Sequence, residues 1–181
     1  MSFKAIIGQS RALELIIRQL RSGCLKGSYL FSGPRGTGKL LTALTLAKAL
    51  NCQNQEFDSC DICSSCKRID SFNYPDVFVI ERRGGDSQIR IDCIRSMLDR
   101  IVLRPFEGRW KVFIIRDAEG LTAEAASCLL KILEEPLDDS LIILTSSNPG
   151  LILPTVLSRC KKIPFGHLPT QDVYNILSKE Y

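Results

Sequence analysis

Apolar positions near the start of the chain follow helical spacing. Between residues 10 and 22 they recur at i, i+3, i+4 and i+7, at Leu13, Ile16, Ile17 and Leu20. This spacing places them on one face of an amphipathic helix. Ser10 is the expected N-cap, because its hydroxyl can accept a hydrogen bond from an N–H of the first turn. The pattern therefore predicts that a helix opens the domain.

Further along, short runs that are apolar throughout alternate with helical patterns. The runs predicted to be strands are 29–31, 77–80, 112–115, 141–145 and 162–165. Helical patterns cover 40–50, 91–103, 123–134 and, more briefly, 153–158. Continuous apolar strands separated by helices are typical of a parallel sheet covered on both faces. The predicted fold class is α/β, a five-stranded parallel sheet with helices on both faces.

The last residues follow a different pattern. Residues 166–169 resemble a linker, and residues 170–181 begin a helix with Val173, Ile176 and Leu177 on one face. This apolar face has no expected partner in the chain. We therefore expect one domain over 1–165, followed at 166–181 by the start of a second unit, and we expect the sequence to be a fragment of something longer.

Composition narrows the function classes. The 181 residues are 45% apolar and 24% charged, as in a globular protein, and the net charge of +4 is compatible with nucleic-acid binding without establishing it. No apolar run approaches the roughly 20 residues of a membrane helix, and no secretory signal opens the chain, so we expect a cytoplasmic protein without membrane contact. His167 is the single histidine, which sets aside Ser-His-Asp and Cys-His hydrolases.

A glycine-rich segment lies between the first predicted strand and the next helix. It reads G-P-R-G-T-G-K, with Gly33, Gly36, Gly38 and Lys39 at the positions of a G-x-x-x-x-G-K phosphate loop. Such glycines let backbone N–H groups surround phosphate, and the lysine reaches the terminal phosphates. Leu40 follows where Ser or Thr would bind Mg²⁺. The loop is therefore degenerate: it either binds phosphate without this magnesium ligand or is a turn kept for its backbone geometry.

A second magnesium ligand is missing after the strand at 112–115. In P-loop ATPases this strand ends in an acid that helps to hold Mg²⁺, and in many of them a glutamate follows. Here Arg116 takes the first of these positions. If the register slips by one, Asp117 could hold the metal, but Ala118 then stands where the glutamate belongs. Together with Leu40, either alignment predicts that the chain does not hydrolyse ATP and has no magnesium site.

Four of the eight cysteines crowd into a short segment, at Cys52, Cys60, Cys63 and Cys66. In a reducing cytosol such a cluster indicates a metal site rather than disulfides. Four thiolates at this spacing can surround one Zn²⁺ in a structural site that stabilises an inserted module at 52–66. An iron–sulfur cluster, inert thiols and disulfides are the alternatives.

Arginines are interpreted mainly as surface charges. Arg159, in Ser158-Arg159-Cys160, closes a short helix, where an arginine usually offsets the helix dipole or lies in solvent. Seven further arginines are interpreted as solvated surface residues, and contact with DNA phosphates is the alternative. They are Arg82, Arg83, Arg90, Arg95, Arg100, Arg104 and Arg109.

Several motifs occur together in one order. They are Ile7-Gly8-Gln9, the segment from Tyr29 to Lys39, the four cysteines, Leu129-Leu130-Lys131-Ile132-Leu133-Glu134-Glu135-Pro136, and Ser158-Arg159-Cys160. With these motifs the chain resembles the AAA+ domain of bacterial DNA polymerase III clamp-loader subunits over nearly its whole length. The resemblance implies a P-loop AAA+ domain at 1–165 with the zinc module inserted, and the linker and first helix of a truncated helical lid domain at 166–181.

The family includes ATP-hydrolysing subunits, called gamma or tau, and a non-hydrolysing type, delta prime, with degraded nucleotide motifs and a retained S-R-C. Leu40 and Arg116 make the chain resemble the non-hydrolysing type. The resemblance then implies that Arg159 is an arginine finger that reaches a neighbouring subunit's ATP. Ser146 and Ser147 match the family's polar sensor position after the fourth strand.

The resemblance also implies a set of partners. They are gamma/tau-type ATPase subunits, the delta subunit, the sliding clamp and, through the complex, primed DNA, all within the DNA polymerase III holoenzyme, a nucleotidyltransferase that acts in DNA replication. Two other functions stay open on the sequence. One is an ATP-hydrolysing subunit of the gamma/tau type, and the other is a zinc-dependent nucleic-acid-binding module.

Overall fold

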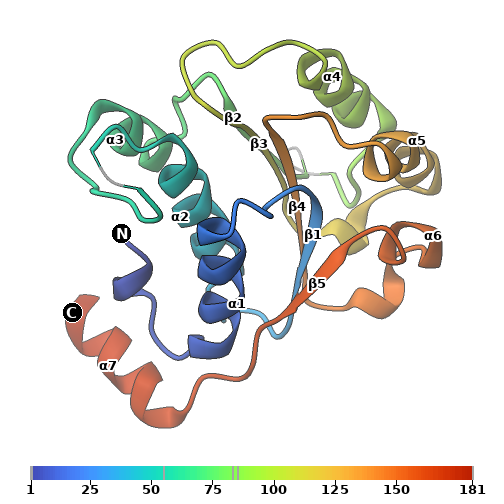
Figure 1. Cartoon of the computed structure of the whole chain (residues 1–181). Coiled ribbons are helices and arrows are strands. Elements are labelled where there is room, and N and C mark those ends of the chain that lie inside the picture. The colour runs from blue at the N-terminus through green and yellow to red at the C-terminus, as the bar shows by residue number, and fades with distance from the viewer. Residues whose placement is uncertain (1, 55, 83, 85, 181) are drawn as a thin grey trace.

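The computed structural model describes residues 2–54, 56–82, 84 and 86–180, and its main feature is a five-stranded sheet (Figure 1). The strands are β1 (Gly27–Ser32), β2 (Val77–Ile80), β3 (Lys111–Ile115), β4 (Ser140–Ser146) and β5 (Lys161–Pro164). All neighbouring strands are parallel, in the order β2-β3-β4-β1-β5. The predicted parallel sheet is therefore confirmed.

Helices cover both faces of this sheet. They are α1 (Ser10–Arg21), α2 (Lys39–Asn51), α3 (Ser64–Asp70), α4 (Ile91–Ile101), α5 (Ala123–Glu134), α6 (Pro154–Leu157) and α7 (Thr170–Glu180). Figure 1 shows α1 and α2 on one face, and α4, α5 and α6 on the other. Strand β1 supplies both cores, because Tyr29 and Phe31 pack with the first group and Leu30 with the second.

The start of α1 differs from the sequence-based expectation. Gln9, not Ser10, occupies the N-cap position, and its side chain makes no capping hydrogen bond, so the predicted Ser10 cap was wrong. The buried Gln9 amide instead pairs with the backbone of Gly166: Nε2 donates to the carbonyl at 2.9 Å, and Oε1 accepts from the N–H at 3.1 Å. This pair fixes the linker that leaves β5 against the beginning of the domain.

Two buried charges hold the segment between α4 and β3. The Asp76 carboxylate accepts hydrogen bonds of 2.7–2.8 Å from the backbone N–H groups of Phe106, Glu107 and Gly108. The Lys111 ammonium donates to the carbonyls of Arg100, Leu103 and Arg104. Because Asp76 directly precedes β2 and Lys111 begins β3, these hydrogen bonds anchor the segment between α4 and β3 to the two neighbouring strands.

Helix α7 lies beside the beginning of the chain, below α1 in Figure 1. Gly8 makes this approach possible, since a Cβ there would lie 2.4 Å from the Leu168 side chain. Val173 and Leu177 on α7 are 40% and 51% exposed, whereas Ile176, the third residue of the predicted apolar face, is half-buried. Within the described ranges, the structure contains no helix both long enough and apolar enough to span a membrane.

Candidate functional site

The phosphate loop connects the carboxyl end of β1 to α2. Gly33 approaches β5 so closely that a Cβ would lie 2.1 Å from the Phe165 carbonyl oxygen, a contact that requires glycine. Gly36 and Gly38 have φ angles of 75° and 84°, in the left-handed region that glycine enters without strain. The glycines therefore have separate structural roles. Gly33 permits the close approach to Phe165 at the end of β5, and Gly36 and Gly38 permit the left-handed backbone of the loop.

Lys39 lies inside this loop. Its Nζ donates to the carbonyl oxygens of Gly33, at 2.6 Å, and Pro34. Burial lowers the pKa of Lys39, while the charges of Glu119 and Asp117 oppose the shift. An ammonium group has three donors, so the two carbonyls fix its position and leave one N–H for a ligand.

The predicted departures from magnesium chemistry all lie around one pocket. Leu40 and Arg116 line a cavity of about 440 Å³ at the loop, together with Thr145 at the end of β4. Arg116 follows β3 directly, and its Nη1 donates to Glu81 Oε2 at 3.0 Å. The structure thus brings together the loop and the two residues that are predicted to stand in place of magnesium ligands.

Cations outnumber acids in the lining of this pocket. Arg35, Arg82, Arg116 and Lys39 line it, and Asp117 is the acid among the residues described there. Arg82 is exposed, as the sequence-based interpretation of solvated surface expects, and it also lines this pocket, which the sequence did not predict. Nothing in its sequence context marks it, because the pocket forms only when the ends of β2 and β3 meet.

Glu119 is a second residue that sequence reasoning did not assign. Its Oε1 accepts hydrogen bonds from the N–H and hydroxyl of Ser147, at 3.0 and 2.6 Å. Burial raises the pKa of Glu119, but these hydrogen bonds outweigh burial and lower it overall. Ser146 is buried next to this pair and accepts from the Asn148 N–H. The two serines at the predicted sensor position are thus bonded within the chain.

The four clustered cysteines meet in the inserted module. Cys52 follows α2, Cys63 caps α3 and Cys66 lies on α3, a helix that the sequence pattern did not predict. The sulfur atoms of these three and Cys60 all lie within 4.8 Å of one another, so they could hold a metal ion. All eight cysteines are described, and each is a free thiol.

Hydrogen bonds prepare this cluster for thiolate chemistry. Burial opposes ionisation of Cys60, but N–H groups of Cys63 and Ile62 donate to its sulfur and lower its pKa to about 6. Burial raises the pKa of Cys66. A metal ion would draw all four into the thiolate form, because coordinated thiols are deprotonated.

A buried lysine fastens the cysteine module to α2. Lys48 is almost wholly buried, and its Nζ pairs with Asp61 at 2.6 Å and Asp70 at 3.0 Å. Its pKa is raised, because these ion pairs outweigh the effect of burial. The module is thereby positioned by charge as well as by its cysteines.

Arg159 lies just after α6, away from the residues that line the phosphate pocket. Its Nε donates to Glu134 Oε1 at 2.7 Å, and Nη2 donates to the same oxygen. Nη1 donates to the Thr155 carbonyl at 2.6 Å. The side chain is 30% exposed, and these hydrogen bonds orient it at the surface.

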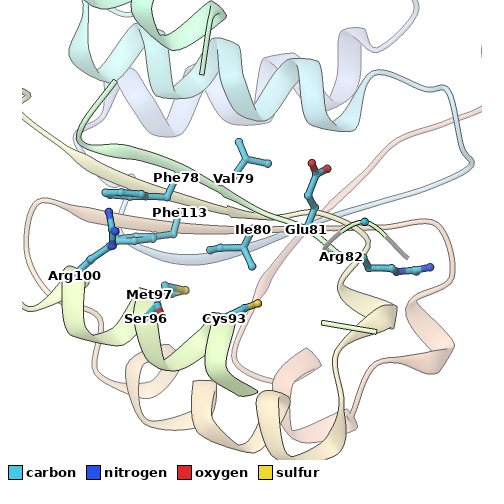
Figure 2. A pocket seen from close by; sticks show the side chains of 11 residues that line it. Phe78, Val79, Ile80, Glu81, Arg82, Cys93, Ser96, Met97, Arg100 and Phe113 are labelled. Atoms are coloured by element: carbon cyan, nitrogen blue, oxygen red, sulfur yellow. The ribbon is translucent and has the colours of Figure 1, made fainter. Parts of the chain in front are cut away.

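A further pocket of about 530 Å³ lies beside the edge strand β2, on its α4 side. Figure 2 shows Phe78 and Ile80 pointing to this side, while Glu81 points to the opposite side of the sheet. Phe78 stacks on Phe113 at 4.9 Å, and the Arg100 guanidinium lies 5.0 Å from the Phe78 ring centre. This pocket contains none of the predicted site residues.

Comparison with known proteins agrees with this arrangement. A family described as "DNA polymerase III, delta subunit" matches residues 8–169. DNA polymerase III subunit delta' of Bacillus subtilis is 35% identical over 172 residues, which is 95% of this chain and 52% of that protein. The chain belongs to this family of DNA polymerase III clamp-loader subunits.

Relatives of the gamma/tau type are also similar to this chain. Subunit gamma/tau of Mycobacterium tuberculosis H37Rv is 34% identical over 179 residues, 98% of this chain and 31% of that protein. The chain therefore spans about half the length of the delta prime relative and about a third of the gamma/tau relative.

Solved structures extend the comparison to the fold. A gamma subunit-related protein of Thermotoga maritima aligns with a TM-score of 0.69 and 25% identity, over 93% of this chain and 49% of that chain. The RuvB Holliday junction branch migration motor of T. maritima aligns with a TM-score of 0.61 and 17% identity, over 98% and 51%. The clamp-loader chain thus has the AAA+ fold.

We expect the cysteine cluster to bind one metal ion per chain. Cys66→Ser removes a buried ligand and should lower the bound metal to well under half, because three thiolates leave the tetrahedral site incomplete. Chelation should increase amide exchange at 52–66 before it reaches the sheet, which has its own apolar core. Elemental analysis and hydrogen exchange measure these effects.

Cys24→Ser is the matched control, since Cys24 is exposed and lies outside the cluster. Equal metal content in the Cys66 variant and this control would show that the cluster does not bind the ion.

Proposed function

We propose that the chain is part of a non-hydrolysing clamp-loader subunit that docks beside ATPase subunits and supplies Arg159 to a neighbour's ATP during sliding-clamp loading. Gamma/tau-type subunits, the delta subunit, the clamp and primed DNA are the partners in this proposal. It rests most on one observation: a well-formed phosphate loop lies beside Leu40 and Arg116, where a hydrolysing site needs two magnesium ligands.

The chemistry of these two residues argues against hydrolysis. A leucine side chain offers no oxygen to Mg²⁺, and the Arg116 guanidinium repels the ion at the end of β3. The ion pair with Glu81 keeps Arg116 at this position. An ATP-hydrolysing role of the gamma/tau type is therefore disfavoured, although the family contains such subunits.

The surroundings of Arg159 support a role outside its own phosphate pocket. Guanidinium has five N–H donors, and the contacts to Glu134 and Thr155 use three of them. Nη2 keeps a second N–H, and the second N–H of Nη1 reaches Ser158 Oγ only at 3.4 Å. The outer end of the side chain can therefore engage phosphate oxygens while Glu134 fixes its orientation.

We further propose that the metal in the cysteine cluster is zinc and that it is structural. Four cysteine ligands leave no open coordination position, so the ion stabilises the module and takes no part in a reaction. Iron in the purified protein would instead indicate an iron–sulfur cluster. A nucleic-acid-binding zinc module is less well supported, because the net charge is only +4.

The isolated chain should not hydrolyse ATP, and Leu40→Thr should not restore hydrolysis. The new hydroxyl returns one magnesium ligand but leaves Arg116 facing the ion. Phosphate release with and without magnesium measures this. Leu41→Thr places the same hydroxyl one residue later and is the matched control. Turnover by the Leu40 variant above that control would contradict our interpretation of Arg116.

Arg159→Ala should sharply reduce ATP hydrolysis at the neighbouring site. An arginine finger stabilises charge on the transferring phosphoryl group and contributes on the order of 10³- to 10⁵-fold in rate. Arg159→Lys should also be impaired, because lysine lacks the planar fork. The measurement is DNA- and clamp-stimulated hydrolysis in a reconstituted complex whose other sites are inactivated.

The variants must still assemble with the ATPase subunits, which gel filtration of the complex establishes. Arg11→Ala, an exposed arginine on α1, is the matched control and should leave the rate unchanged. If the complex with Arg159→Ala hydrolyses ATP at the wild-type rate, Arg159 is not an arginine finger and only forms an ion pair at the surface.

A further inference from the structure

The pocket at the phosphate loop, which is lined by Lys39 and three arginines, suggests a binding activity beyond the proposed function. We infer that it binds a nucleoside polyphosphate without magnesium, with arginine side chains in place of the metal ion. The inference concerns the chain's own phosphate loop and is independent of Arg159.

The backbone needed to hold phosphate is present. Gly36 and Gly38 shape the loop, and α2 begins directly after it, so the N–H groups of the first helical turn face the pocket. Lys39 is only 8% exposed, and its hydrogen bonds to two backbone carbonyls hold its ammonium group at the loop. These features do not require a metal ion.

Three arginines supply the charge that magnesium would otherwise provide. Arg35, Arg82 and Arg116 line the same pocket as Lys39. The Arg82 guanidinium packs against Gly120, where a Cβ would lie 2.8 Å from its Nε. Because guanidinium groups engage phosphate oxygens in pairs, they can neutralise a polyphosphate directly.

The acids near this pocket do not form a substitute metal site. Glu81 is paired with Arg116 and lies at the end of β2 (Figure 2). Glu119 is bonded to Ser147, and Asp117, the acid that lines the pocket, offers a single carboxylate among four cations. Leu40 contributes only apolar surface.

Charge then decides which form of the ligand binds. A metal-free triphosphate carries two more negative charges than its magnesium complex, and so gains more from four cations. Magnesium on the ligand would also lie close to Arg116. The site should therefore prefer the metal-free form, in contrast to a hydrolysing P-loop site.

Binding of ATP to the full chain tests this inference. Calorimetry in EDTA should give measurable affinity, and excess magnesium at matched ionic strength should lower that affinity by on the order of 10-fold. Inorganic triphosphate should compete with ATP in EDTA, because recognition is through the phosphates. Arg116→Ala should weaken binding about 10-fold, as the loss of one charge-assisted contact predicts.

Leu40→Thr with Arg116→Asp rebuilds both magnesium ligands and should reverse the metal dependence. Arg11→Ala is the control for net charge and should bind as wild type does. Arg116→Gln, which keeps a polar side chain, serves if the rebuilt variant does not fold. The inference is overturned if wild type binds only with magnesium, if no binding occurs in EDTA, if inorganic triphosphate fails to compete, or if Arg116→Ala and Arg116→Gln bind like the control.

None of these outcomes bears on the arginine-finger proposal. The binding experiment contains no neighbouring subunit, whereas the Arg159 experiment measures turnover at a neighbour's site. Either can fail while the other holds.

Discussion

The parallel register of the central sheet is the constraint on which the site depends. Ser32 pairs with Ser146 across β1 and β4, and Ile115 pairs with Leu144 across β3 and β4. Parallel strands bring their carboxyl ends to one edge. The phosphate loop, Arg116 and the Glu119–Ser147 pair therefore meet there, although they come from separate parts of the chain.

This edge combines a preserved scaffold with altered chemistry. Gly33 still permits the close approach to β5, and Lys39 is still held within the loop. The substitutions at Leu40 and Arg116 leave this backbone intact and change only the side chains that a magnesium ion would need. In our proposal this scaffold serves phosphate binding and an intersubunit role without ATP hydrolysis of its own.

Sequence patterns predicted the strands, the glycine-rich loop between β1 and α2 and the cysteine cluster, because each is encoded by local spacing. Long-range pairing explains most of what they missed. Gln9 bonds Gly166, which lies 157 positions away, and this contact was invisible when Ser10 was expected to cap α1. Arg82 and Glu119 enter the site only through the meeting of strand ends, and Lys48 pairs with acids that the cysteine module places beside α2.

The central claim is that this chain acts on a neighbour's nucleotide and not on its own. A structure of the assembled complex with a non-hydrolysable ATP analogue tests it directly. Our account predicts that Nη1 or Nη2 of Arg159 lies within hydrogen-bond distance of the γ-phosphate in the adjacent subunit, with Glu134 still on Nε. An Arg159 side chain bonded only within its own chain, with the neighbour's γ-phosphate contacted by other residues, would contradict it.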